Sequence, residues 1–496
     1  MLPEALTAVL AGLEVFHTSG GLAYADLRIE NHRQTWPIRG AVFRGWLRRM
    51  HYEATREALS AGTVRAALDL LEARAQFDGP ERAVHLRVAE HGGRIYLDLA
   101  NDRWEAVEIG ADGWQVIAAP LVRFSRRPGM LALPRPERGG SIEDLASLLN
   151  LQSRTDFVLL VSWLFAAFRG VGPYPLLAIS GEQGSAKTTL SKLLRALVDP
   201  NMAPVRALSR DQRELMIAAN NGHLLAFDNL SAVPAGLSDA LCRLASGGSF
   251  AVRQLYTDDD EVLFDAARPI LLNGIEDIIG RADLADRAIF LNLGPIPEEE
   301  RRAESELWRD FELKRPYILG VLFDAVARGL QELSRVQLKV LPRMADFAVW
   351  ATACETALWP GHTFIHAYEC NRKDAINHAV EADPVASYVR KMMAERNSWE
   401  GSAGRLQREG AALAIAGWPA NARVLAGRLR RAQTCLRALG MEITFSREGH
   451  DGSRIICIRR PAAASVTQQT PGRDENQHRL RKSSPSARVK TEAGIW

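Results

Sequence analysis

A glycine-rich loop between an apolar run and an amphipathic segment constrains the fold of this chain more than any other feature. Residues 175–180 form a short apolar run with a β-branched member, which predicts a buried strand. The loop Gly181-Glu-Gln-Gly-Ser-Ala-Lys-Thr-Thr189 follows, and leucines then recur at helical spacing until Asp199-Pro200 ends the helix. Strand, glycine-rich loop, Lys-Thr and helix, in this order, are the context of a phosphate-binding loop.

Such a loop binds phosphate through successive backbone N–H groups at the start of a helix. We expect Lys187 to reach the β- and γ-phosphates of a nucleotide, and the hydroxyl of Thr188 to bind Mg²⁺. Ala186 stands where the motif has its second glycine, and its methyl group predicts an ordinary backbone conformation there. The expected nucleotide-binding residues are Gly181, Gly184, Ser185, Ala186, Lys187, Thr188 and Thr189.

A second apolar run, residues 222–229, predicts a strand that ends beside this loop. Asp228 at its end would hold Mg²⁺ through water and orient it against Thr188, and a turn-capping aspartate is the structural alternative. Many ATPases of this kind carry a glutamate next, as the base for the attacking water. This chain has Asn229, which orients water but accepts no proton, and Glu182 inside the loop is the alternative base.

A third run, residues 268–274, predicts another buried strand, and its Asn273 is suited to bind the attacking water or the γ-phosphate. Arg287 stands at the mouth of the next predicted strand. It is a candidate arginine finger for the nucleotide of a neighbouring subunit. A local salt bridge with Asp283 or Asp286 is the alternative.

Residues 250–256 and 261–264 flank an acidic turn between these strands and predict a β-hairpin. The tip is acidic from Asp258 to Glu261, which argues against phosphate contact at that point. Arg253, at the base of the hairpin, is therefore the better candidate for a DNA contact.

Four of these features, in their order and spacing, resemble the AAA+ class of P-loop ATPases: Gly181–Thr188, Asp228, Asn273 and Arg287. With the hairpin between the second and third motifs, the series is similar to superfamily 3 helicases and to the C-terminal ATPase of phage and plasmid primase-helicases. Residues 225–231 and 255–261 also resemble ATP-binding proteins of bacterial mobile elements.

The resemblance covers about residues 140–350. It implies an α/β P-loop NTPase core with a parallel sheet, ATP and Mg²⁺ as cofactors, a homo-oligomeric ring, and a hairpin that reaches DNA in a central pore. It also implies a helical lid with a second sensor arginine, for which Arg343 is the candidate by position and a surface salt bridge is the alternative. Residues 298–314 and 318–330 are the first predicted lid segments.

Residues 422–439 predict an arginine-rich helix, and residues 442–445 and 454–458 predict two strands behind it. This is the order of a winged helix, with the helix in the major groove of DNA and the wing on the backbone. Residues 401–460 hold eleven arginines against four acidic residues, which points to a polyanionic partner. Arg428 and Arg431 are the candidate contacts, and protein binding by this domain is the alternative.

The N-terminal region has alternating strand patterns, including a hairpin around Gly92-Gly93, and two segments with helical spacing. Asp26 and Asp98 lie on predicted strands and raise the alternative of a metal-dependent, primase-like site, although isolated strand carboxylates are usually solvent-facing. The predicted domains are a mixed α/β domain (1–135), the ATPase core (141–297), the helical lid (298–395), the winged helix (396–460) and a disordered tail (461–496).

The five cysteines are scattered without a C-x-x-C pair, so the sequence predicts neither a zinc site nor disulfides. This use of cysteine predicts a reducing, cytoplasmic compartment. The longest apolar run, residues 157–168, is too short to span a bilayer, and no signal peptide is visible, so we expect no membrane contact. The predicted function is that of an ATP-hydrolysing DNA replication protein, a helicase-like motor of a phage or mobile element. A nucleotide-gated DNA-binding switch and a regulatory AAA+ protein are the alternatives.

Overall fold

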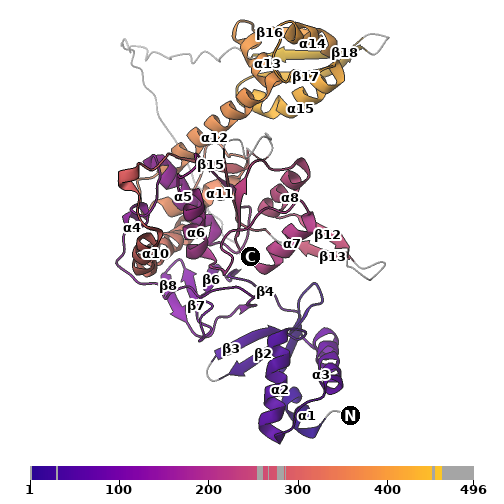
Figure 1. Ribbon diagram of the computed structural model, residues 1–496, viewed down its shortest axis with the longest axis vertical. Helices are drawn as coiled ribbons and strands as arrows, with labels where there is room; N and C mark the ends of the chain where they lie inside the picture. Colours follow the sequence, from indigo (N-terminus) through magenta and orange to yellow (C-terminus); the bar gives the residue numbers. More distant parts are fainter. Residues whose placement is uncertain are drawn as a thin grey trace, which may run out of the picture.

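The chain folds into three tiers stacked along one long axis (Figure 1). A small N-terminal unit lies at one end, a larger central body lies in the middle, and a C-terminal unit lies at the other end, reached through helix α12 (Thr363–Ala382). The computed structural model describes residues 3–29, 32–253, 261–265, 267–275, 284, 286–448 and 453–460.

The N-terminal unit is a three-stranded antiparallel sheet covered by helices, in the strand order β1-β2-β3. Its apolar residues, from Leu6 to Ala75, form a hydrophobic core of their own. Ser60 caps the third helix by accepting a hydrogen bond from the N–H of Thr63. The elements are α1 (Glu4–Ala11), β1 (Glu14–His17), β2 (Ala23–Ile29), β3 (His32–Pro37), α2 (Ala41–Thr55), α3 (Ala61–Ala73) and the π-helical turn η1 (Arg74–Asp78).

A second antiparallel sheet follows, in the order β5-β6-β7-β8. The predicted hairpin at Gly92-Gly93 is present, and both glycines have positive φ, as a tight two-residue turn requires. The strands are β5 (Val88–His91), β6 (Arg94–Asp98), β7 (Ala106–Gly110) and β8 (Gly113–Ile117). Two short strands, β4 (Val84–His85) and β9 (Arg123–Phe124), pair in parallel beside them.

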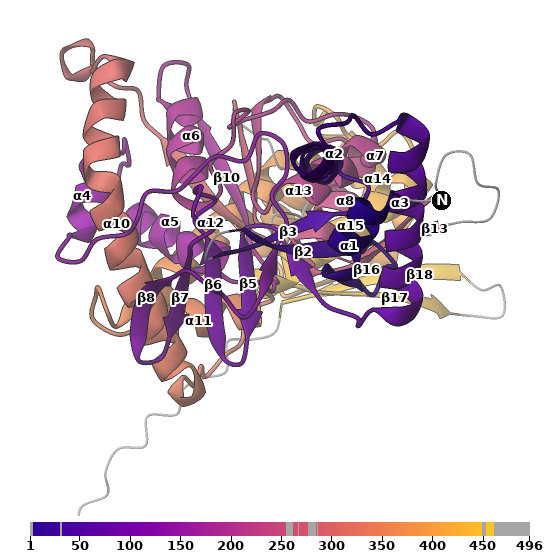
Figure 2. The ribbon, with the colours of Figure 1, turned by 90° about the horizontal axis from the view of Figure 1, so that it is seen from below.

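This sheet belongs to the central body rather than to the N-terminal unit. Figure 2 shows its four strands beside helix α10 (Glu304–Glu332). The indole of Trp114 packs edge-on against Phe323 of α10 and donates to Asp324 at 2.9 Å. Val88, Ile95 and other sheet residues share one hydrophobic core with the helices of the central body. The domain boundary predicted at residue 135 therefore cuts through a shared core.

Helix α5 (Arg154–Ala167) is the predicted longest apolar run, and it lies inside the central core. Its eleven residues from Phe157 to Ala167 are all buried. The shorter helix α4 (Ile142–Ala146) precedes it and begins with a capping box formed by Ser141 and Asp144. In the described part of the chain, no helix combines the length and apolarity that a membrane span requires.

The centre of the body is a parallel sheet, as predicted, with four strands in the order β11-β14-β10-β15. Alternate residues of β10 face opposite cores: Leu177 and Ile179 pack with α5 and α6, and Leu176 and Ala178 pack with α7 and α8. The strands are β10 (Leu176–Gly181), β11 (Leu225–Leu230), β14 (Ile270–Gly274) and β15 (Ala288–Leu293), and the helices are α6 (Lys187–Val198), α7 (Gln212–Asn221) and α8 (Ala235–Ser246).

The predicted hairpin between the second and third motifs is formed by β12 (Ser249–Arg253) and β13 (Glu261–Asp265), which pair antiparallel. Residues 254–260, which include most of the predicted acidic tip (Asp258 to Glu261), lie outside the described residues, as does the predicted tail at 461–496.

Helix α10 is a single helix of 29 residues, although the sequence predicts two segments on either side of Pro316. The proline sits inside the helix, and its carbonyl accepts the N–H of Glu137 at 2.9 Å, so the preceding linker packs against this turn. Helix α11 (Ala345–Glu355) joins the same core through Trp350, whose indole donates to the carbonyl of Phe165 at 2.9 Å. Two 3₁₀ turns flank α10, η2 (Glu298–Glu300) and η3 (Leu333–Arg335).

The C-terminal unit is a three-stranded antiparallel sheet, in the order β16-β18-β17, packed against three helices. Strand β16, which the sequence analysis does not predict, pairs with β18 from Ser398 to Ser402. Helix α13 (Pro384–Ala394) shares this core, so the unit begins before the boundary predicted at residue 396. The remaining elements are β16 (Ser398–Ser402), α14 (Ala403–Ala411), α15 (Ala422–Ala438), β17 (Glu442–Glu448) and β18 (Ser453–Arg459).

Candidate functional site

The predicted phosphate-binding loop joins the end of β10 to the start of α6. Gly181 has φ of 148°, and a side chain there would collide with the carbonyl oxygen of Leu293 on the neighbouring strand β15. Gly184 has φ of 84° in the middle of the loop. Glycine is therefore required at Gly181 both by conformation and by space.

Ala186 does not have the ordinary backbone conformation that its methyl group predicts. It is the N-cap residue of α6 and lies in the left-handed region, with φ of 65° and ψ of 25°. A left-handed conformation costs a residue with a Cβ about 1–2 kcal/mol, which glycine avoids. The loop thus retains the conformation of a glycine-containing motif although the glycine is absent.

Lys187 is the first residue of α6, and its ammonium group folds back over the loop. Its Nζ donates to the carbonyl oxygens of Gly181 at 2.8 Å and Glu182 at 2.7 Å, and approaches the hydroxyl of Ser185 at 3.4 Å. Ser185 is fully buried, and its hydroxyl also donates to the carbonyl of Glu182 at 2.8 Å. These bonds hold a positive charge at the rim of the loop.

The structure brings Thr188 and Asp228 together. The hydroxyl of Thr188, on the first turn of α6, donates to Oδ1 of Asp228 near the end of β11 at 3.1 Å. A hydroxyl and a carboxylate are both oxygen ligands of the kind that Mg²⁺ takes. In the described residues, no cluster of three or more histidine, cysteine, aspartate or glutamate side chains is arranged to hold a metal by itself.

A chain of hydrogen bonds connects the two strand ends to α6. The backbone N–H of Asn229, which has a left-handed φ of 57°, donates to Oδ1 of Asn273 at 3.1 Å. Nδ2 of Asn273 donates to the hydroxyl of Ser191 at 2.6 Å, and that hydroxyl donates to the carbonyl of Lys187 at 2.9 Å. Asn273 is 1% exposed, so its amide is fixed by β11, β14 and α6 together.

The predicted residues surround one open cavity of about 650 Å³. Of the residues predicted to act at this site, Gly181 and Arg287 do not line it. Glu182, the alternative base, is exposed in the loop and does not line it either. The lining residues are Gln183, Gly184, Ser185, Ala186, Lys187, Thr188, Thr189, Asp228, Asn229, Asn273, Gly274 and Ile275.

Asn150 supports the loop from behind and is absent from the sequence prediction. Its Nδ2 donates to the carbonyl of Ser185 at 3.2 Å and to that of Gly294 at 2.8 Å. It thereby ties the loop to the residue that follows β15. No local pattern marks this asparagine, because its two partners lie 35 and 144 residues away in the sequence.

Arg287 lies just before β15, as predicted, and its Nη1 donates to the hydroxyl of Ser246 at 3.2 Å. Asp286, one of its two alternative partners, forms ion pairs with Arg343 at 3.3 Å and Arg372 at 2.9 Å. The salt bridge weighed for Arg343 is therefore present. Asp283, the other alternative partner of Arg287, lies outside the described residues.

The two strand carboxylates of the N-terminal region have structural roles. Their pattern predicts that they face solvent, but both are buried. Asp26 is 4% exposed and receives hydrogen bonds from Thr35 and from Arg123 at 2.7 Å. Asp98 is 1% exposed and is paired with Arg126 at 2.8 Å. Each carboxylate is buried and bound to its own arginine, so the two do not form a primase-like metal site together.

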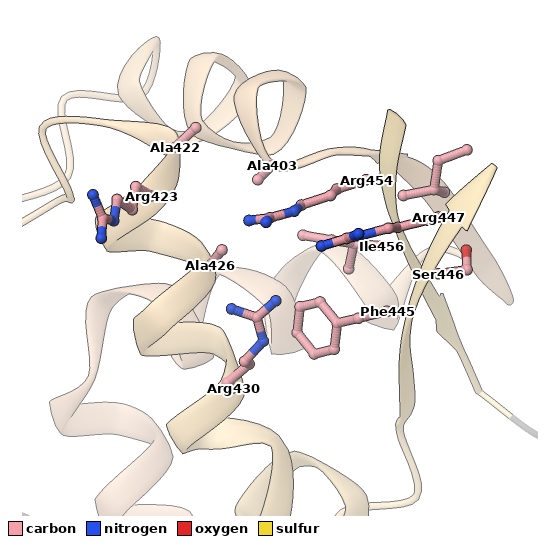
Figure 3. A pocket seen from close by; sticks show the side chains of 11 residues that line it. Ala403, Ala422, Arg423, Ala426, Arg430, Phe445, Ser446, Arg447, Arg454 and Ile456 are labelled. Atoms are coloured by element: carbon pink, nitrogen blue, oxygen red, sulfur yellow. The ribbon is translucent and has the colours of Figure 1, made fainter. Parts of the chain in front are cut away.

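The predicted DNA contacts separate in the structure. Arg428 on α15 donates to the carbonyl of Gly417 at 2.9 Å, and Arg431 is exposed on the same helix. The side chain of Arg253 lies outside the described part of the hairpin. A cavity of about 840 Å³ between α15 and the hairpin of β17 and β18 is instead lined by four arginines that the sequence analysis does not single out, Arg423, Arg430, Arg447 and Arg454 (Figure 3).

Comparison with solved structures finds similarities at low sequence identity. An apo structure of the NrS-1 C-terminal region is 11% identical, covers 92% of this chain and 99% of that chain, and has a TM-score of 0.42. A structure of SCCmec type IV Cch, described as an active helicase, is 10% identical, covers 90% of this chain and 93% of that chain, and has a TM-score of 0.46. No curated protein matches the chain.

Two family models match the sequence. Residues 142–377 match the replication protein of actinomycete integrative conjugative elements, and residues 385–474 match the C-terminal domain of the same protein. The first match contains every residue that lines the cavity beside Lys187, and the second contains most of the C-terminal unit. Over both regions, the chain is similar to the RepA replication proteins of actinomycete integrative conjugative elements.

Proposed function

We propose that this chain is an ATP-binding and ATP-hydrolysing replication protein that acts on DNA as a helicase-like motor of a mobile element. The observation that carries the proposal is the 3.1 Å contact between Thr188 and Asp228 beside Lys187, at one cavity. The similarity to replication proteins of integrative conjugative elements supports the replication role.

The residues present fit a nucleotide with Mg²⁺. The backbone of the loop and the start of α6 offer N–H groups to phosphate oxygens, and Lys187 adds a full positive charge. Thr188 and Asp228 supply a hydroxyl and a carboxylate at one point, which suits Mg²⁺ held by one or two protein oxygens, water and phosphate. When bound, Mg²⁺ supplies charge neutralisation to the phosphates.

The described residues that line the cavity offer no separate general base for the attacking water. Asp228 is the only carboxylate among the described residues that line the cavity, and it is already assigned to the metal. Asn229 and Asn273 line the cavity and carry amides that would orient a water molecule, but an amide does not take its proton. This observation favours a second candidate function, a nucleotide-gated DNA-binding switch with little hydrolysis.

The wider architecture is part of the proposal. We assign residues around β10, β11, β14 and β15 to a P-loop ATPase core of AAA+ type, α10 and α11 to its lid, and the C-terminal unit to a winged helix. Arg287 would then reach the nucleotide of a neighbouring subunit in a homo-oligomeric ring. Measurement of the molecular mass in solution with and without ATP tests the ring directly.

Binding of a fluorescent ATP analogue in the presence of Mg²⁺ tests the site. Lys187→Ala is expected to abolish binding, because it removes the charge at the rim of the loop. The matched control is Lys192→Ala on the same helix, since Lys192 pairs with Glu304 at 3.2 Å and does not line the cavity. Equal affinity of both variants and the unsubstituted protein would overturn the assignment of this site.

A further inference from the structure

The hairpin of β17 and β18 carries a pair of like charges that folding alone does not explain. Arg447 and Arg454 are directly opposite each other in the antiparallel register. Like charges in this position destabilise a hairpin, because their side chains lie close together on one face. The next cross-strand pair on the same face, Phe445 and Ile456, is apolar. On this face of the hairpin, the apolar pair Phe445 and Ile456 is therefore followed by the charged pair Arg447 and Arg454.

Helix α15 supplies the opposite wall of the cavity. Arg423 and Arg430 are seven residues apart, so they lie two turns apart on one face of the helix, with Ala426 between them. All three residues line the cavity of about 840 Å³. The side chain of Arg430 extends toward the hairpin, whereas the guanidinium group of Arg423 lies on the outer side of the helix, at the edge of the cavity (Figure 3). The guanidinium group of Arg430 stacks over the ring of Phe445, 4.6 Å from its centroid. Four arginines from two walls therefore surround one groove.

Within the described part of the chain, the four arginines of the groove have no acidic partner, whereas two other arginines of this unit do. Arg405 in the same unit is paired with Glu409 at 2.9 Å, and Arg390 with Glu381 at 2.9 Å. Among the described residues, no carboxylate forms an ion pair with the four arginines of the groove, which are Arg423, Arg430, Arg447 and Arg454. Their charge is available to a ligand.

The floor of the groove indicates what kind of anion it takes. Ala403, Ala422 and Ala426 leave room close to the backbone, and Phe445 and Ile456 present an apolar surface between the charged walls. A small inorganic anion would use the guanidinium groups but not the apolar floor. A chain that carries both phosphates and flat bases uses both, since phosphates pair with arginines and bases stack on aromatic rings.

We propose that this groove binds single-stranded nucleic acid, with phosphates on the four arginines and a base at Phe445. A helix that enters the major groove of duplex DNA does so with a face that projects from the protein. Ala426 and Arg430 of α15 face the hairpin instead, so the groove between helix and hairpin suits one flexible strand, with Arg423 at its outer edge (Figure 3). This proposal adds a binding site to the proposed action on DNA, and it rests on that proposed function for the expectation that the strand is DNA.

Fluorescence anisotropy with the full chain, without nucleotide, tests the groove. The probes are a labelled dT oligonucleotide of about 15 residues, the same length of rU, and the corresponding duplex as competitor. We expect Arg430→Ala/Arg454→Ala to weaken single-strand binding about 100-fold, and to reduce the slope of log K against log salt by about 1.4. The duplex is expected to compete weakly, and a preference for rU over dT would assign the groove to RNA.

The matched control is Arg431→Ala/Arg437→Ala, which removes the same charge from exposed positions outside the groove. It is expected to weaken binding less than about threefold. Equal or greater loss in this control, together with tighter duplex binding, would overturn the groove and support the helix in the major groove. Unchanged binding by both double variants would also overturn it.

Three further variants separate the groove from misfolding and from the nucleotide site. Arg454→Thr removes the opposed charges, so it is expected to raise the thermal midpoint while it weakens binding. Phe445→Leu is expected to weaken binding of the dT strand roughly tenfold and to leave an abasic strand unaffected. Lys187→Ala is expected to bind the strand normally without nucleotide, so a failed ATP site would leave this result standing.

Discussion

The hydroxyl of Thr188 donates to Oδ1 of Asp228 across 3.1 Å, although the two residues are 40 positions apart in the sequence. One lies at the start of α6 and the other near the end of β11, so the contact joins the loop to the sheet. Removal of the hydroxyl by Thr188→Val takes away one oxygen ligand for Mg²⁺ and the partner of Asp228.

We therefore expect Thr188→Val to lose at least about tenfold in ATP affinity with Mg²⁺ and little without it. Thr188→Ser keeps the hydroxyl and is expected to restore the dependence on Mg²⁺. Titration of a fluorescent ATP analogue with and without the metal checks both variants. Equal dependence on Mg²⁺ in the valine variant would show that this pair does not hold the metal.

Ala186 is strained by its left-handed conformation, and substitution there is expected to show it. Ala186→Gly should raise the free energy of unfolding by up to about 1 kcal/mol, since relief of strain exceeds the entropy that glycine adds to the unfolded chain. Ala66→Gly, at an exposed position inside α3, should lower it by about 1 kcal/mol. Urea denaturation of both variants checks the opposite signs, and a fall for Ala186→Gly would contradict the assigned strain.

The end of α6 is tied to the β5–β8 sheet by a buried ion pair. Nε of Arg87, which is fully buried, donates to Oδ1 of Asp199 at 3.0 Å. Of the cationic partners in the described residues, Arg87→Met leaves that carboxylate with Arg195 at 3.2 Å, and it should cost about 3 kcal/mol of stability. Arg94→Met, which breaks an exposed pair with Asp112, should leave the midpoint nearly unchanged. Chemical denaturation compares the two, and equal losses would contradict a special role for the buried pair.

His223, beside the same ion pair, predicts a pH dependence of stability. Burial, together with the charge of Arg268, lowers the pKa of His223 to about 4, and its Nε2 lies 2.7 Å from the carbonyl of Ala167. Burial opposes ionisation of Asp199, but Arg195 and Arg87 outweigh it and hold the pKa of that carboxyl well below its ordinary value. The carboxylate therefore stays charged in the range where the histidine matters.

Because the folded pKa of His223 is lowered, the unfolded chain binds more protons below the ordinary histidine pKa of about 6.5. Its stabilising contribution is thus present at neutral pH and is lost as the pH falls toward about 4. We expect the free energy of unfolding to fall by about 2 kcal/mol between about pH 7 and pH 5, and His223→Gln to remove most of this fall. Denaturation of both proteins at the two pH values checks the expectation, and an equal slope in the variant would refute it.

Much of the central sheet could be predicted from sequence, because each strand is a short apolar run that ends in a polar residue. That pattern, together with the phosphate-binding loop and the AAA+ resemblance, predicts Asp228 and Asn273 at one site, and both line the cavity beside the loop. The order of the strands could not be read in this way, since β10 lies between β14 and β15, which both follow it along the chain. Hydrogen-bond pairing between distant strands decides that order.

The features that were missed depend on contacts between distant residues. Asn150 fixes the loop through carbonyls that no local pattern identifies. The sequence predicts two segments on either side of Pro316, but α10 runs through this residue, whose carbonyl also accepts the N–H of Glu137 from the distant linker. The arginine groove depends on the register that opposes Arg447 and Arg454. In each case tertiary structure overrides or completes a local signal.

Phosphate release from ATP in the presence of single-stranded DNA is the most direct test of the proposed motor. The account predicts that the unsubstituted protein releases phosphate faster with DNA, that Lys192→Ala does the same, and that Lys187→Ala releases none above background. Full DNA-stimulated release by Lys187→Ala would contradict the assigned site. Tight ATP binding without release in the unsubstituted protein would contradict the motor and leave the nucleotide-gated switch.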